Sequence, residues 1–367
     1  MLPKLCWRRR KVKINVRDVI ATLDRIVTLR SASIRDIAAR AGTSVSTVSA
    51  VLNGSWQKRR IKPDTAEKIT ALADQMGFLP NRQAQALRGD RSGMIGMILP
   101  MHDNRFFSAI SQSFEQESRA RGLFPVIVSA LRDPDLELDA ARHLLGYRID
   151  TLFVVGATAP DAVADLALAN GVRVFNLDLP GTRAPSIVSD SFGGCRALTD
   201  AVLAACPVPV DRALFIGGRH ADHATGERLR GFLASIGAHR PGLIPEIVTE
   251  GYGADKAEAR MRAILAAGGP PPVIVVNSTI AFEGVVRVLR DLPPATLAQL
   301  AIGVFDYDPF AALLNMPILM VRQRGDRLVQ RAFDELARAE ALPAAPILIP
   351  CEMVETPLWR AMAARSG

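Results

Sequence analysis

The sequence predicts two kinds of domain, a small all-α part at the N-terminus and a larger α/β part made of two lobes. Three observations support this division. Helical periodicity with clear start and stop signals fills residues 33–76. From Gly93 onward, short apolar runs alternate with helical stretches. These runs are continuously apolar, which is typical of parallel strands covered on both faces. The length of 367 residues also suggests two or three domains.

The N-terminal part begins with two short helices. In "SIRDIAARAG", Ser33 can cap a helix that stops at Gly42. "TSVSTVSAVLNG" follows directly, and Ser44 can cap this second helix. Two short helices joined by a glycine-containing turn form a helix-turn-helix. A third helix is expected in "DTAEKITALADQMGF", with a capping-box-like start at Asp64 and Glu67. We therefore expect a helix-turn-helix headpiece over residues 31–79.

A short linker follows the headpiece at residues 80–92. Pro80 breaks the chain, and "NRQAQALR" has the length of two helical turns. A helix this short is marginal in water on its own. It can fold when a partner buries its apolar face. The segment is therefore predicted to be a conditionally folded hinge helix.

The α/β part is expected to span residues 93–357. Too many apolar runs occur for one compact sheet, so two similar lobes are predicted, with a ligand between them beyond the strand ends. The expected strands lie at residues 93–100, 125–130, 151–157, 172–178, 212–218, 245–251, 271–277, 300–306 and 318–323. The clearest helical stretches are Ser108–Gly122, Leu136–Leu145, Gly226–Ile236 and Lys256–Ala267. We assign residues 93–188 and 323–345 to lobe one, 189–320 and 346–357 to lobe two, and 358–367 to a tail.

The charge of the chain is unevenly distributed. The net charge is +8, but residues 1–90 hold 18 Lys/Arg against 7 Asp/Glu, while the rest holds 27 against 30. A basic head on a mildly acidic body suggests that the head binds a polyanion. A solubilising basic face is the alternative that charge alone leaves open.

Several classes of protein are disfavoured by the same sequence. No run of about 18 apolar residues predicts a membrane span. The basic N-terminus is not followed by an uninterrupted apolar segment, so we expect no signal peptide and a cytoplasmic protein. Neither the four cysteines nor the five histidines have ligand spacing, so no metal or cofactor is expected. No motif of an NTPase, a serine hydrolase, a zinc protease or a dinucleotide-binding enzyme occurs.

Residues 1–30 have no assigned role at this stage. "WRRRKVK" is a charge run, and "VRDVIATLDRIVTLR" is compatible with one amphipathic helix. The segment could be an extra arm that contacts DNA, or it could result from translation from an upstream start codon. We favour a non-essential extension.

Three motifs resemble the LacI/GalR family of transcriptional regulators. "SIRDIAARAGTSVSTVSAVLNG" is similar to the family's headpiece, "GFLPNRQAQALRG" to its hinge helix, and "GMIGMILP" to the first strand of its effector-binding core. The connector "NGSWQKRRIKPDT" and the stretch "IGVFDYDPFAALLNMPILMVRQ" look most like the fructose and sucrose repressors.

The resemblance implies a homodimeric repressor of carbohydrate genes with a periplasmic-binding-protein-like effector domain. Its affinity for double-stranded operator DNA would be controlled by a sugar or sugar-phosphate effector. A sugar-binding protein without a DNA role has the same two-lobed fold and is the alternative, although the basic headpiece counts against it. An enzyme is not expected.

The resemblance places DNA contacts on the second helix, the connector and the hinge. Val45 and Ser46 would face the major groove with Ala50 one turn later, where the family often has arginine, while Ser44 and Thr47 would contact phosphates or cap the helix. In the hinge, Leu87 would insert between base steps, and Ala84 would allow two hinge helices to approach. The remaining expected contacts are Lys58, Arg59, Arg60, Asn81 and Arg82.

The resemblance also places an effector site at strand ends. A sugar site needs bidentate polar groups over an apolar floor. Leu179 stands where the fructose-repressor subgroup often has an arginine suited to a phosphate. This departure counts against a phosphosugar effector; a neutral sugar, or a phosphate held by Arg228 or Arg105, stays open. The expected effector-binding residues are Asp103, Asn104, Phe106, Phe107, Asp178, Arg228, Asn277, Ser278 and Asp306.

Overall fold

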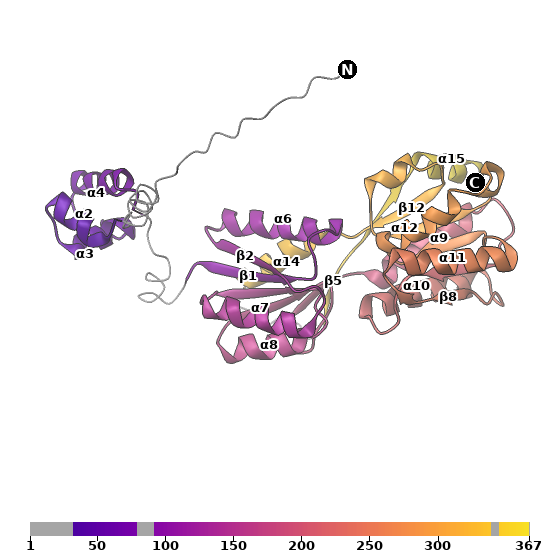
Figure 1. The fold of residues 1–367 in the computed structure, drawn as a ribbon, viewed down its shortest axis with the longest axis horizontal. Helices are drawn as coiled ribbons and strands as arrows, with labels where there is room; N and C mark the ends of the chain where they lie inside the picture. The colour runs from indigo at the N-terminus through magenta and orange to yellow at the C-terminus, as the bar shows by residue number, and fades with distance from the viewer. Residues whose placement is uncertain (1–31, 79–91, 339–344, 367) are drawn as a thin grey trace, which may run out of the picture. The chain divides into compact units, whose positions relative to one another are not determined.

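The computed structural model describes residues 32–78, 92–338 and 345–366, which fall into two compact units. The first unit is Met1–Gly89 and the second is Asp90–Gly367. Figure 1 shows the head helices and the two-lobed body. The expected N-terminal extension at residues 1–30 and the expected hinge contacts lie outside the described residues. Those hinge contacts are Asn81, Arg82, Ala84 and Leu87.

The head contains three helices: α2 (Ile34–Ala41), α3 (Val45–Leu52) and α4 (Pro63–Gln75). Ser33 and Asp36 form a capping box at the start of α2, and Gly42 ends that helix with the left-handed φ of 68° that glycine adopts without steric cost. The apolar faces meet in a small core around Ile37, Val48 and Ile69, each fully buried. These contacts make the three helices one folded module.

The expected capping box at the third helix is wrong. The helix begins at Pro63, and Lys62 occupies the N-cap position without a side-chain cap. Proline is favoured at the first helical position because its missing N–H would have no partner there. Asp64 lies in the first turn, where a negative charge suits the helix dipole.

Lobe one is a six-stranded, all-parallel sheet in the order β13-β5-β4-β3-β1-β2. Phe114, Phe153, Phe175 and Phe333 pack against one another in its core, with neighbouring ring centroids 5.1–6.1 Å apart. Its strands are β1 (Met94–Leu99), β2 (Phe124–Ser129), β3 (Thr151–Val155), β4 (Arg173–Leu177), β5 (Ser186–Ser189) and β13 (Ile347–Ile349). Its helices are α6 (Arg105–Ala120), α7 (Pro134–Gly146), α8 (Pro160–Ala169) and α14 (Gly325–Ala337).

Lobe two repeats this layered plan with the strand order β14-β12-β11-β10-β6-β8, in which only β14 is antiparallel to its neighbour. Its sheet is formed by β6 (Ala213–Ile216), β8 (Glu246–Val248), β10 (Val273–Val276), β11 (Ala301–Phe305), β12 (Ile318–Arg322) and β14 (Glu352–Glu355). Its helical segments are α9 (Ser191–Ala205), α10 (His223–His239), α11 (Ala254–Gly268), α12 (Thr279–Leu289), α13 (Pro294–Leu297), the 3-10 turn η1 (Pro309–Leu313) and α15 (Pro357–Ser366). A two-stranded ribbon joins β7 (Gly218–Arg219) to β9 (Glu250–Gly251).

The assignment of residues 346–357 to lobe two is partly wrong. β13 pairs with β5 in the lobe-one sheet, and only β14 returns to lobe two. In the described residues the chain therefore crosses between the lobes after β5, after β12 and after β13 (Figure 1). Such pairing is decided by the partner strand, which the local sequence does not reveal.

The expected tail at residues 358–367 is an ordered helix over most of its length. Trp359 in α15 is only 2% exposed and belongs to a lobe-two core cluster with Leu198 and Phe215. Because burying a tryptophan contributes a large apolar surface, α15 belongs to the lobe. Among the described residues, no helix is long and apolar enough to cross a membrane.

Candidate functional site

The N-terminal end of α3 carries a cluster of hydroxyl groups. The Ser44 Oγ accepts a hydrogen bond from the Thr47 backbone N–H at 3.1 Å and lies 2.7 Å from Ser46 Oγ and 2.8 Å from Thr47 Oγ1. Ser44 and Ser46 are exposed, Thr47 is half-buried, and Val45 is 44% exposed. A helix N-terminus with clustered hydroxyls and an adjacent methyl-bearing side chain can contact both phosphates and base edges.

Ala50 does not share this surface. It is only 3% exposed, so the expectation that it faces DNA is wrong. The turn that follows α3 folds back on this part of the helix, where the backbone N–H and the Oγ of Ser55 donate to the Ala50 carbonyl at 2.9 and 3.3 Å. The position is therefore a packing position in this chain.

The connector between α3 and α4 presents an exposed basic turn. Lys58, Arg59 and Arg60 are all exposed, and none forms an ion pair with another described residue. Trp56 anchors the turn by packing on the head core, and the Ile61 N–H donates to the Trp56 carbonyl at 3.0 Å. Unpaired cations on a fixed turn are suited to phosphate oxygens.

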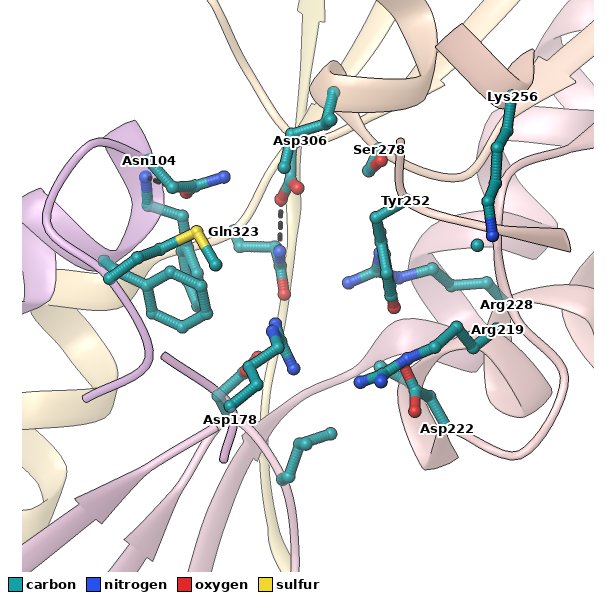
Figure 2. Close-up of a pocket in the computed structure, with 18 of the residues that line it drawn as sticks. Asn104, Asp178, Arg219, Asp222, Arg228, Tyr252, Lys256, Ser278, Asp306 and Gln323 are labelled. Carbon is teal, nitrogen blue, oxygen red and sulfur yellow. Dashed lines mark hydrogen bonds and ion pairs between the residues drawn. The ribbon is translucent and has the colours of Figure 1, made fainter. Parts of the chain in front are cut away.

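The body contains a pocket of about 310 Å³ lined by residues from both lobes. This volume is at the lower end of the range for small-molecule sites and suits a ligand of monosaccharide size. In Figure 2, Asn104 and Asp178 face Arg228, Tyr252 and Ser278 across the pocket, with Asp306 and Gln323 between the two sides. Seven of the nine expected effector residues line it: Asn104, Phe106, Phe107, Asp178, Arg228, Ser278 and Asp306.

Arg228 is the buried cation of this pocket. It is 4% exposed, its Nη1 donates to the Asn277 carbonyl at 2.7 Å, and its Cζ lies 3.9 Å from the centroid of the Phe305 ring. Its Nε is buried without a hydrogen-bond partner among the described residues. A buried, incompletely bonded guanidinium favours a ligand that supplies the missing acceptor.

Two carboxyl groups from different lobes face this cation. Asp178 follows β4 with φ 71°, and Asp306 follows β11 with φ 80°, so both have the left-handed backbone that non-glycine residues rarely adopt. Burial raises the pKa of Asp178 to about 6, although Arg132 and Arg228 act to lower it. Burial also raises the pKa of Asp306, against Arg228 and a hydrogen bond from Gln323 Nε2. Such carboxylates accept hydrogen bonds from ligand hydroxyls well.

Asn277 lies behind the pocket lining. It is fully buried, and its Nδ2 lies 3.4 Å from Thr225 Oγ1. A Cβ at Gly218 would come within 2.3 Å of that Nδ2, which explains why glycine stands at this position after β6. The side chain therefore orients neighbours, while Ser278 caps α12 at the pocket edge by accepting from the Ala281 N–H at 3.2 Å.

Asp103 also lies off this pocket. It is exposed and borders a neighbouring hollow. The reason is local, because Asn104 caps α6 through its Oδ1, which accepts from the Phe106 N–H at 2.9 Å. The cap directs Asn104 inward and leaves Asp103 on the outer side of the turn.

Sequence reasoning missed several pocket residues that come from turns and short strands. Gln323 directly follows β12, so its position at a strand end was a signal that could have found it. Tyr252 and Arg219 lie at the short ribbon strands β9 and β7, which have no clear sequence signal. The polar lining residues that were missed are Arg132, Arg219, Asp222, Glu250, Tyr252, Lys256 and Gln323.

The two parts together define a class of protein: a small-molecule-binding body of two α/β lobes that carries a helix-turn-helix head. Comparisons with known proteins agree with this definition. The family described as "Bacterial regulatory proteins, lacI family" matches residues 33–81. The ribitol operon repressor of Klebsiella aerogenes is 44% identical over 196 residues, which cover 53% of this chain and 73% of that protein. The fructose operon regulatory protein of Vibrio cholerae is 31% identical over 265 residues, 70% of this chain and 79% of that protein.

A solved structure shows the same fold. The lac repressor dimer bound to operator and an anti-inducer superposes with a TM-score of 0.77 at 22% identity, over 89% of this chain and 98% of that one. The chain belongs to the LacI family of bacterial regulatory proteins. It is therefore a DNA-binding regulator and not an enzyme.

Proposed function

We propose that this protein binds operator DNA as a homodimer in the cytoplasm and that a sugar-type molecule in the interlobe pocket controls its affinity for the operator. The observation that carries the proposal is that one chain holds two separate surfaces with polar groups available to another molecule. The head presents hydroxyls and cations that have no acidic partner in the described ranges, whereas the body presents a pocket with incompletely bonded polar groups. The first suits nucleic acid, and the second suits a polyhydroxylated ligand.

On the DNA side, we assign base contacts to Val45 and Ser46 and phosphate contacts to Ser44, Thr47 and the basic turn. Val45 and Ser46 are the exposed residues of the first turn of α3. The hinge residues Asn81, Arg82, Ala84 and Leu87 are assigned to the minor groove on the family resemblance.

On the effector side, we assign ligand contacts to the polar residues that line the pocket. Arg228 supplies donors, and Asp178 and Asp306 supply acceptors, over the rings of Phe106 and Phe107. Because the pocket lining comes from both lobes, a bound ligand would stabilise one lobe arrangement over others. Such differential binding is what couples a ligand to a distant site.

The test is a footprint of the full chain on DNA upstream of its own operon, with random duplex as competitor. We expect protection of a palindromic site that survives competitor excess, and a change in protection when an effector is added. Equal affinity for all duplexes would contradict the proposal. A Val45→Glu variant, which places a negative charge on the exposed first turn of α3, should lose the specific footprint. Leu233→Glu, at an exposed position of the body, is the matched control.

A further inference from the structure

The turn between β2 and α7 holds two residues in an unfavourable backbone conformation. Leu131 has φ 53° and Arg132 has φ 58°, and the Asp133 N–H donates to the Ala130 carbonyl at 2.9 Å. Such a turn normally carries glycine, asparagine or aspartate at both central positions. A side chain with a Cβ is strained in this left-handed conformation. Strain of this kind persists where the surroundings fix it, and it often marks functional positions.

Two hydrogen bonds from lobe one hold this turn in place beside the pocket. The Leu131 N–H donates to the Pro100 carbonyl at 2.8 Å, and Thr158 Oγ1 donates to the Arg132 carbonyl at 3.2 Å. Both contacts reach from neighbouring strand ends of lobe one. Hydrogen bonds from lobe one therefore hold Arg132 in a backbone conformation that arginine rarely adopts by itself.

The Arg132 side chain bridges the two lobes. Its Cζ lies 5.6 Å from the centroid of the Phe107 ring in lobe one and 5.6 Å from the centroid of the Tyr252 ring in lobe two. Both rings line the pocket, as Arg132 does. Aromatic contacts engage the faces of a guanidinium and leave its N–H groups available in its plane.

Those N–H groups have no protein acceptor among the residues that the structure describes. Arg219 pairs with Asp222 at 3.1 Å, but no carboxylate lies within 4.0 Å of Arg132. Of the charges near Asp178, that of Arg132 has the largest effect in lowering the Asp178 pKa. Both groups line the same pocket, and they are not within ion-pair distance of each other.

We propose that Arg132 is a specificity-determining residue that, together with Asp178, binds one hydroxyl group of a neutral polyhydroxylated effector. This inference rests on the proposed function of the pocket. The guanidinium donates to the hydroxyl oxygen, and the hydroxyl donates to the carboxylate. A hydroxyl can do both at once, whereas an unprotonated phosphate oxygen can only accept.

The charge of the lining favours a neutral ligand as well. Four basic side chains (Arg132, Arg219, Arg228 and Lys256) are matched by four acidic ones (Asp178, Asp222, Glu250 and Asp306). Leu179 adds apolar surface beside Asp178. A phosphate group placed between Arg132 and Asp178 would be repelled by the negative charge of the carboxylate. This repulsion would select against a phosphorylated ligand.

The test is calorimetric titration of the full chain with four- to six-carbon sugar alcohols and sugars, among them ribitol and D-fructose, and with their phosphate esters. We expect a neutral compound to bind, and its phosphate ester to bind at least about tenfold more weakly. Arg132→Met should weaken the neutral compound about 10- to 100-fold, as loss of a charged hydrogen bond does. The matched control is Arg142→Met, an exposed position on α7.

A second variant separates binding from folding. Arg132→Asn suits the left-handed turn, so we expect a Tm at or above that of the wild type together with loss of the neutral compound. Tighter binding of phosphate esters, no binding of any neutral compound, or wild-type affinity in both Arg132 variants would overturn the inference. The operator footprint is measured in the same preparations. Its loss in the wild type refutes the proposed function, whereas an intact footprint that responds only to phosphate esters refutes this inference alone.

Discussion

The head and the body of this protein treat their charged groups in opposite ways. In the body, basic side chains are often neutralised within the chain: Arg287 contacts Asp255, Glu258 and Glu283, and Arg324 contacts Asp326 and Glu352. In the head, Lys58, Arg59 and Arg60 have no acidic partner among the described residues. Many basic side chains of the body are therefore paired with acidic side chains of the body. The cations of the basic turn in the head are instead open to another molecule.

The pocket of the body, like the basic turn of the head, holds polar groups without a partner among the described residues. Arg132 has no carboxylate partner in the described part of the chain, and Arg228 Nε and Gln323 Oε1 are buried there without hydrogen-bond partners. Groups that another molecule could satisfy therefore occur at the candidate binding surface of each region.

The largest effect is expected from removing the buried cation of the body. Arg228→Ala should abolish the effector response, with at least about a 100-fold loss of effector affinity, because it removes the donors that face Asp178 and Asp306. Effector titration of operator binding measures the response. Arg230→Ala is the matched control, since Arg230 lies on the same helix and is exposed. A normal response in Arg228→Ala would remove this residue from the site.

The next largest effect is expected at the hinge, which lies outside the described residues. By family resemblance, Leu87→Ala should weaken binding to a bent palindromic operator by about 10- to 100-fold, because an inserted side chain stabilises the kinked DNA. Gel shifts on operator and on random duplex measure the ratio. If operator affinity were unchanged while the fold stays intact, the assignment of this segment as a DNA-inserting hinge would be wrong.

A smaller and more specific effect is expected at the basic turn. Neutralising Lys58, Arg59 and Arg60 together to Gln should reduce the slope of log affinity against log salt by about 2 to 3, since each phosphate contact contributes roughly 0.9. Affinity for all duplexes should fall in parallel. An unchanged slope would indicate that the turn is a solvated loop.

The smallest effect concerns stability. The pKa of Asp178 is raised to about 6 in the folded protein, so the ionised carboxylate destabilises the fold above pH 6, and this cost disappears as the pH falls toward 4. Asp178→Asn should therefore increase the free energy of unfolding at pH 7.5 by about 1 to 3 kcal/mol and have little effect at pH 4. Thermal unfolding across this pH range measures the difference. Equal gains at both pH values would contradict the assignment.

The sequence predicted the regular parts of this fold well because their signals are local. Nine apolar runs coincide with strands, and Ser33, Gly42 and Ser44 lie at the expected helix ends. The short strand Ser186–Ser189 was missed because four residues with two serines carry no apolar run. The lobe assignment of Ile347–Ile349 failed because it depends on pairing with a strand some 160 residues away.

The candidate site was predictable to the extent that strand ends define it. The family resemblance named Asp178, Asn277 and Asp306, all of which follow strands, and the structure places Asp178 and Asp306 in one pocket. Arg132 was missed because its position depends on a strained turn and on rings from two lobes. Ala50 was placed on the DNA by analogy with relatives, and only packing shows that the turn around Ser55 buries it.

The most direct test of the account is whether the two unsatisfied surfaces are thermodynamically coupled. Effector affinity of the full chain is measured by calorimetry in the absence and in the presence of saturating operator, and operator affinity is measured with and without the same effector. We expect both affinities to change by one common factor, as linkage requires when the head and the pocket share a conformational equilibrium. An effector affinity that is unchanged by operator, in a protein that binds both, would contradict the account.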